Sequence, residues 1–100
     1  MEFGCCLKDF LASFGWLLHN FRMEYRRFGK TNEKISVITL GGMRFKHGWN
    51  PPRNYLPAES IKNCIEITKK AFDVGINHIE TAYGYMKSEN LYGISLKELG

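Results

Sequence analysis

The chain has 100 residues, a formal net charge of +4 and a hydrophobic content of 44%. This composition excludes an intrinsically disordered chain, because enough apolar surface is available to bury a core. The lysines and arginines are dispersed, with no run longer than a pair. The mild positive charge therefore predicts no nucleic-acid partner, since binding phosphates requires clustered cations.

Apolar residues recur at spacings of three and four through residues 1–22, which predicts an amphipathic helix. These residues are Phe3, Leu7, Phe10, Leu11, Phe14, Leu17, Leu18 and Phe21. Lys8 and Asp9 interrupt the stretch, so neither a secretory signal nor a membrane span is expected. Its polar face lacks the excess of cations typical of a membrane-surface helix. We expect residues 1–22 to be an extension outside the main fold: a helix packed on it, a disordered segment, or a stretch upstream of a natural start at Met23.

The pattern changes from Met23 onward. Alternating residues around a turn between Gly29 and Lys34 predict a short hairpin that leads into a strand over residues 35–40. This strand is almost continuously apolar, which suits burial on both faces. The pair Pro51 and Pro52 then excludes a helix or a central strand, so a loop is predicted before Pro57.

A helix is predicted to begin at or just after Pro57 and to end at Gly75 in the left-handed conformation. Its buried stripe is predicted to contain Ile61, Cys64, Ile65, Thr68 and Phe72, with Ala71 beside it, while Lys62, Glu66, Lys69, Lys70 and Asp73 face water. A second strand is predicted over residues 77–82. Ser88 is predicted to N-cap a last helix, with Glu89 in its first turn and Leu91, Ile94, Leu96 and Leu99 as apolar contacts.

The order strand, loop, helix, strand, helix predicts an α/β fold with parallel strands joined by helical crossovers. Two parallel strands form no closed structure alone, so we expect either a fragment of a larger fold or dependence on a partner. An open strand edge also predicts self-association.

The three cysteines, Cys5, Cys6 and Cys64, are an odd number without CxxC spacing. They indicate neither a zinc site nor a disulfide framework, and no metal ligand is predicted in this chain. A reducing, cytoplasmic location is expected. Cys64, on the inner stripe of its helix, is expected to be a small buried hydrophobe.

Three segments, EYRRFGKTNEKIS, LGGMRF and GINHIETAYGYMKSENLYG, resemble the start of the aldo/keto reductase family. The likeness is greatest to the branch that carries a ferredoxin-like C-terminal region, and it covers residues 23–100. It implies the N-terminal hairpin and the first two βα units of a (β/α)₈ TIM barrel, a fold of about 250 residues. It also allows a 4Fe-4S cluster in the full-length protein, with ligands outside this chain.

The resemblance implies that aldehydes or ketones are reduced with NADPH through an Asp, Tyr, Lys and His tetrad. Negative charge grows on the carbonyl oxygen as hydride arrives, so a proton donor is needed. Tyr85 matches the tetrad tyrosine, because it follows the strand-end carboxylate Glu80 by five residues. Glu80 replaces the usual Asp, and Met86 replaces the glycine that usually follows the tyrosine. The Lys and His would lie beyond this chain, so we expect the chain alone to be inactive.

The same resemblance implies that the backbone of Gly42 and Met43 approaches the nicotinamide of NADP(H) and that Glu80 contacts its ribose. The sequence contains no GxGxxG motif, so nothing in it indicates a Rossmann domain. The alternative to an enzyme is a non-catalytic, truncated product that acts only as an interaction or folding module.

Five other side chains carry weaker expectations. Arg44 is expected to neutralise either a carboxylate or a cofactor group, with the carboxylate favoured. His78, on the same strand face as Glu80, is expected to be a hydrogen-bonded core histidine. Trp49 and Tyr55 are expected either to line a substrate pocket or to anchor their own loop. Tyr83 is expected to pack or to support its loop.

Overall fold

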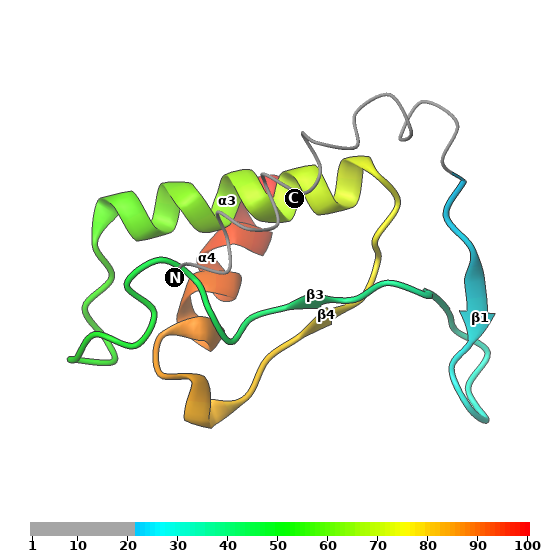
Figure 1. The fold of residues 1–100 in the computed structure, drawn as a ribbon, viewed down its shortest axis with the longest axis horizontal. Helices are drawn as coiled ribbons and strands as arrows, with labels where there is room; N and C mark the ends of the chain where they lie inside the picture. The colour runs from blue at the N-terminus through cyan, green and yellow to red at the C-terminus, as the bar shows by residue number, and fades with distance from the viewer. Residues whose placement is uncertain (1–21) are drawn as a thin grey trace.

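A computed structural model describes residues 22–100, so the helix predicted over residues 1–22 lies almost wholly outside the described part of the chain. The described residues form a mixed α/β structure, in agreement with the predicted class (Figure 1). The elements in chain order are β1 (Tyr25–Arg27), β2 (Lys34–Ser36), β3 (Leu40–Gly41), α3 (Ala58–Asp73), β4 (Ile79–Glu80), the 3-10 turn η1 (Tyr83–Tyr85) and α4 (Ser88–Leu99).

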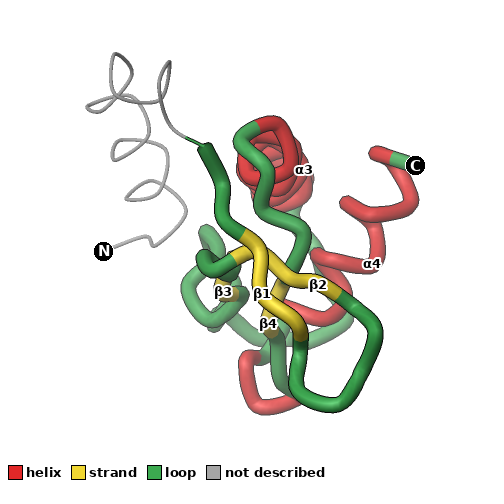
Figure 2. The backbone as a smooth tube through the Cα atoms, turned by 90° about the vertical axis from the view of Figure 1, so that its right-hand side faces the viewer, coloured by secondary structure: helices red, strands yellow, loops and turns green. Residues whose placement is uncertain are grey.

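The predicted hairpin is confirmed. β1 and β2 pair antiparallel, with Arg26 opposite Ile35. The hairpin lies at one end of the described structure (Figure 1), and Figure 2 views the molecule from that end. Hydrogen bonds to Asn77 connect the hairpin to the rest of the structure. The Asn77 side chain accepts from the Ser36 N–H at 2.7 Å and donates to the Lys34 carbonyl at 3.1 Å. The hairpin is thereby fixed to the chain just before β4.

The single strand predicted over residues 35–40 is wrong, because two short strands occur instead. β2 ends at Ser36, whose hydroxyl donates to the Ile38 carbonyl at 2.6 Å across a bend. Val37 and Ile38 lie in this bend, with 52% and 44% of their surface exposed. The partner changes from β1 to β4 at the bend, and an apolar run does not reveal such a change.

The predicted strand, helix, parallel strand unit is confirmed. β3 and β4 pair in parallel, with Leu40 beside Ile79 and Gly41 beside Glu80, and α3 lies between them in the chain. A backbone hydrogen bond of 2.8 Å from Gly42 to the Glu80 carbonyl extends the ladder. The second strand is shorter than the predicted residues 77–82. Both strands end at the same edge, which is where the candidate site lies.

The end of α3 is the predicted left-handed glycine cap. Gly75 has φ +97°, and its N–H donates to the Phe72 carbonyl at 3.0 Å. The next N–H, of Ile76, donates to the Ala71 carbonyl at 3.0 Å. These two bonds form a Schellman motif, which satisfies carbonyls that the helix end leaves free.

The predicted buried stripe of α3 is only partly right. Its buried residues are Ser60, Cys64, Ile67, Thr68 and Ala71, whereas Phe72 is 39% exposed. The buried face is therefore rotated toward Ile67, because α3 packs against α4 and shares a core cluster with Leu40 of β3. Phe72 instead lines a surface hollow with Tyr25 and Ile76. The residues predicted to face water are all exposed.

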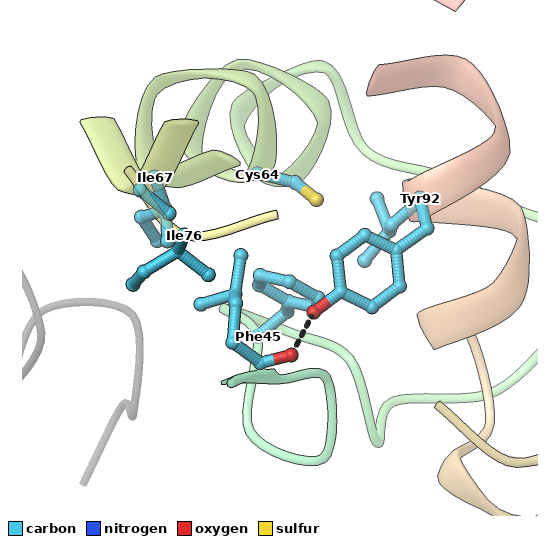
Figure 3. Packing of buried hydrophobic residues seen from close by; sticks show 8 residues of the cluster. Phe45, Cys64, Ile67, Ile76 and Tyr92 are labelled. Atoms are coloured by element: carbon cyan, nitrogen blue, oxygen red, sulfur yellow. Dashed lines mark hydrogen bonds between the residues drawn. The ribbon is translucent and has the colours of Figure 1, made fainter. Parts of the chain in front are cut away.

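The core lies between α3, α4 and the parallel strands. It contains Leu40, Phe45, Cys64, Ile67, Ala71, Ile76, Leu91 and Tyr92. Figure 3 shows the Tyr92 ring reaching from α4 into this cluster, near Cys64. The Tyr92 hydroxyl donates a hydrogen bond of 3.0 Å to the Leu40 carbonyl. Each large apolar side chain in this cluster stabilises the fold by roughly 1.5 to 3 kcal/mol.

The prediction that Ser88 N-caps the last helix is wrong. Ser88 is the first residue of α4, and Lys87 occupies the cap position without a side-chain cap hydrogen bond. The Ser88 hydroxyl is instead hydrogen-bonded to the Thr81 hydroxyl at 2.7 Å. Leu91 is fully buried as expected, but Ile94 and Leu96 are exposed. The first turn of α4 is therefore bonded to the chain that leaves β4.

Candidate functional site

Glu80 and Tyr85 meet at the carboxyl end of β4. Glu80 is the last residue of the strand, and η1 turns the chain back toward it through a 3.0 Å bond from the Tyr85 N–H to the Ala82 carbonyl. The Tyr85 hydroxyl donates to Glu80 Oε1 at 2.7 Å. The structure thus brings together the two residues that the sequence assigned to catalysis.

The hydrogen bond to Glu80 raises the pKa of the Tyr85 phenol, with desolvation and the charge of Glu80 adding to the effect. A carboxylate that accepts from a phenol stabilises its protonated form. The pair consequently holds a proton at the end of β4. Release of that proton near neutral pH requires a cation close to the pair.

The second oxygen of Glu80 is turned toward Gly41. A side-chain carbon at Gly41 would lie 3.6 Å from Glu80 Oε2. No hydrogen bond from residues 22–100 occupies this oxygen. Glu80 can therefore hold the Tyr85 phenol with one oxygen and accept from an ammonium or a sugar hydroxyl with the other.

Gly42 and Met43, the residues expected to approach a nicotinamide, are already engaged with the protein. Gly42 is buried, and its N–H donates to the Glu80 carbonyl. The Met43 carbonyl accepts from the indole N–H of Trp49 at 2.7 Å. Within residues 22–100 the Gly42 carbonyl and the Met43 N–H stay free of such bonds, so an acceptor and a donor are left for a ligand.

Two cations that the sequence analysis missed hold the loops of the site together. Lys87 is fully buried, and its ammonium donates to the carbonyls of Pro52 and, at 2.6 Å, Tyr55. Arg53 donates to the carbonyls of Tyr83 and Met86, each at 2.7 Å. Loop lysines and arginines are mostly exposed, so no pattern in the sequence distinguishes these two.

The weaker expectations have mixed outcomes. Arg44 is exposed and forms no ion pair with a carboxylate among residues 22–100, so its expected role stays a prediction. His78 is half-buried, and its Nδ1 is hydrogen-bonded to Thr39 at 2.8 Å. Cys64 is buried with a free thiol, as expected. Trp49 anchors its own loop through the bond to Met43.

The aromatic residues that lie next to Lys87 and Arg53 are exposed. Tyr55 is 63% exposed and Tyr83 is 71% exposed. The Arg53 guanidinium lies 3.9 Å from the centre of the Tyr83 ring, in a cation–π contact. Tyr83 therefore supports its loop, as expected.

Neither a metal centre nor a membrane helix is found in the described part of the chain. Residues 22–100 contain no group of three or more His, Cys, Asp or Glu side chains able to hold a metal ion. None of the helices described there has the length and apolarity needed to cross a membrane.

Two comparisons with known proteins find matches to this chain. The model of the Aldo/keto reductase family matches residues 37–99. A putative voltage-gated potassium channel subunit beta from Schizosaccharomyces pombe is 37% identical over 81 residues, which cover 78% of this chain and 21% of the relative. The chain thus spans about a fifth of the length of this relative. No solved structure matches this chain. The family model, which matches more than half of the chain, and the 37% identity to this relative show that the chain belongs to the aldo/keto reductase family.

Proposed function

We propose that this chain forms the first part of the (β/α)₈ barrel of an NADPH-dependent oxidoreductase that reduces aldehydes or ketones. The observation that supports it is the 2.7 Å hydrogen bond from Tyr85 to Glu80 at the carboxyl end of β4. Active sites of (β/α)₈ barrels lie at the carboxyl ends of their strands. The pair stands at that edge, beside the end of β3.

Each residue of the chain has a separate role in this proposal. NADPH, when bound, supplies a hydride to the carbonyl carbon. Tyr85 donates a proton to the carbonyl oxygen, where negative charge develops. Glu80 holds the phenol with Oε1 and receives, on Oε2, a lysine ammonium from the remainder of the barrel. This ammonium is needed because Glu80 alone raises the pKa of Tyr85.

The cofactor and the cellular location are part of the same proposal. The Gly42 carbonyl and the Met43 N–H border the nicotinamide, and Glu80 Oε2 lies where a ribose hydroxyl can approach. A reducing cytoplasm is the location that goes with this proposal, because the three cysteines have no spacing typical of a disulfide framework. The iron–sulfur cluster and the likeness to the ferredoxin-containing branch stay predictions, because no residue of this chain is assigned to the cluster.

A chimera tests the proposal, because the chain covers only 21% of its relative. Residues 23–100 would replace the matching N-terminal segment of an active aldo/keto reductase. We expect the chimera to oxidise NADPH with a carbonyl substrate, and Tyr85→Phe to lower kcat by about 10² to 10⁴, the usual contribution of a positioned proton donor.

Tyr83→Phe is the matched control, since Tyr83 is exposed and its hydroxyl donates no hydrogen bond within residues 22–100. It should leave kcat unchanged. Equal rates for the parent chimera and Tyr85→Phe would rule out Tyr85 as the proton donor.

A second candidate function, a non-catalytic interaction module, is favoured by one observation. Within residues 22–100, β3 and β4 pair only with each other, so each has an outer edge without a partner strand. Exposed Val37 and Ile38 lie just before β3. Such edges pair with other chains. Sedimentation of the purified chain tests this function: we expect a concentration-dependent oligomer, and a monomer at all concentrations would exclude self-association.

A further inference from the structure

The loop after β3 (residues 42–57) and the turn after β4 (residues 81–87) are joined by two cationic side chains. Each segment supplies one cation, which donates to backbone carbonyls of the other segment. Arg53 of the loop donates to the carbonyls of Tyr83 and Met86 in the turn. Lys87 of the turn donates to the carbonyls of Pro52 and Tyr55 in the loop. We call this arrangement of Arg53, Lys87 and their four carbonyl partners the clasp. A backbone bond of 3.1 Å from Lys87 to the Gly48 carbonyl adds to it.

The turn that the clasp holds is strained at Met86. Met86 has φ 56° and ψ −98°, and Lys87 has φ −89° and ψ −4°. These angles match the two central positions of a type II′ turn, whose first central residue is usually glycine. A methionine there costs about 1 to 3 kcal/mol and persists only where surrounding contacts fix the backbone. The Arg53 bond to the Met86 carbonyl is such a contact.

Tyr85 lies between the two carbonyls that Arg53 holds. One nitrogen, Arg53 Nη1, is 2.7 Å from both the Tyr83 and the Met86 oxygen. The backbone on either side of Tyr85 is thus fixed to one guanidinium. The direction of the Tyr85 side chain, and with it the 2.7 Å bond to Glu80, depends on this backbone.

We propose that Arg53 and Lys87 are positioning residues for Tyr85: the clasp holds the strained turn at Met86 so that the phenol stays on Glu80. This inference rests on the proposed function for its catalytic meaning. Lys87 is a positioning residue and not the cation that assists Tyr85, because its ammonium is directed to Pro52 and Tyr55. In the chimera, Arg53→Met therefore lowers kcat more than it raises KM.

The titration of the Tyr85 phenol in the full chain tests the clasp without catalysis. Tyrosinate absorbance is measured against pH, and the difference between each variant and its Tyr85→Phe counterpart isolates Tyr85. The Glu80→Gln variant defines complete loss of the upward pKa shift that Glu80 causes. We expect Arg53→Met to lose more than half of that shift, because the relaxed turn carries the phenol away from Glu80.

Two further variants separate positioning from a general loss of structure. Arg53→Lys, which keeps a charged donor, should restore most of the shift. Met86→Gly should make the turn independent of Arg53, so adding Arg53→Met to Met86→Gly should change the titration much less than Arg53→Met does alone. Arg27→Met, at an exposed strand position, is the control and should change nothing.

The outcomes are distinguishable from those of the proposed function. An unchanged Tyr85 titration in Arg53→Met would overturn the clasp, even if Tyr85 proves essential in the chimera. If Arg53→Met unfolds the chain, the comparison passes to the Met86→Gly background, where Met86→Gly alone is compared with the double variant. A double variant that still loses more than half of the shift would then overturn the clasp. An inactive chimera with the expected titrations would reject the catalytic proposal and leave the clasp standing.

Discussion

The phenol of Tyr92 in α4 donates to the carbonyl of Leu40 in β3 over 3.0 Å, in a part of the core where both side chains are almost fully buried. Burial raises the pKa of this phenol, and nearby Cys64 and Glu80 add to the effect. The bond joins the last helix to the first strand of the parallel pair. Ionisation of Tyr92 would both break it and bury a negative charge.

Alkaline pH should therefore destabilise the chain through Tyr92. The folded pKa lies above the ordinary value of 10.0, so the folded state binds more protons at high pH than the unfolded state. The stabilising contribution is complete below pH about 10 and is lost as pH rises through the raised pKa. Urea unfolding across this range should show a falling free energy of unfolding in the parent and a shallower fall in Tyr92→Phe.

The contributions of Cys64 and Tyr92 to the pH dependence of stability can be measured separately. Burial raises the pKa of the Cys64 thiol above the ordinary value of 9.0, so its contribution begins to fall at lower pH than that of Tyr92. Cys64→Ala should remove only this earlier part of the decline. If the free energy of unfolding fell equally with pH in the parent and in Tyr92→Phe, the decline could not be assigned to Tyr92.

Glu80→Gln should lower the pKa of Tyr85 toward its ordinary value of 10.0. The amide keeps the shape of the side chain but removes the negative charge that stabilises the protonated phenol. The difference in tyrosinate absorbance between Glu80→Gln and the same variant with Tyr85→Phe measures the change. Glu98→Gln, at an exposed position of α4, is the control, and an equal shift in both would show that net charge alone is responsible.

Gly42→Ala should destabilise the chain, because no space exists for a side chain there. The added carbon would lie 2.9 Å from the Glu80 carbonyl oxygen and collide with the Tyr92 ring and the Ser88 hydroxyl. Overpacking of this kind costs about 1 to 3 kcal/mol. Gly93→Ala is the matched control, since Gly93 lies in α4 with nothing within 4 Å, and it should stabilise by about 0.5 to 1 kcal/mol. Denaturant midpoints measure both.

Met86→Gly should stabilise the chain by about 0.5 to 2 kcal/mol, the strain at positive φ less the entropy cost of glycine. Met43→Gly provides the comparison, because Met43 has no positive φ. It should destabilise. Similar losses in both variants, measured by thermal unfolding, would show that the turn at Met86 is not strained.

The sequence predicted those parts of the fold that local chemistry determines. The hairpin, the glycine end of α3 and the parallel order of the strands follow from turn residues and from periodicity, and all are confirmed. The approach of Tyr85 to Glu80 was implied by the family resemblance, and the structure places the two in contact.

The remaining features depend on contacts between distant segments, which a single sequence does not reveal. The break at Val37 arises where the strand partner changes, and the burial of Ile67 in place of Phe72 depends on how α3 meets α4. Ser88 is a good capping residue, but the hydroxyl of Thr81, seven residues earlier, engages it. Lys87 is buried because loop carbonyls from residues 52 and 55 surround its ammonium.

The anchoring of Asn77 has a consequence for the opposite end of β4. The Asn77 amide fixes the start of this segment to the hairpin, and the Tyr25 hydroxyl donates to the Gly75 carbonyl at 2.7 Å beside it. Glu80 follows only three residues later on an extended backbone. The hairpin therefore fixes the segment that enters β4. Through this segment it determines where the strand, and with it the Glu80 carboxylate, is placed.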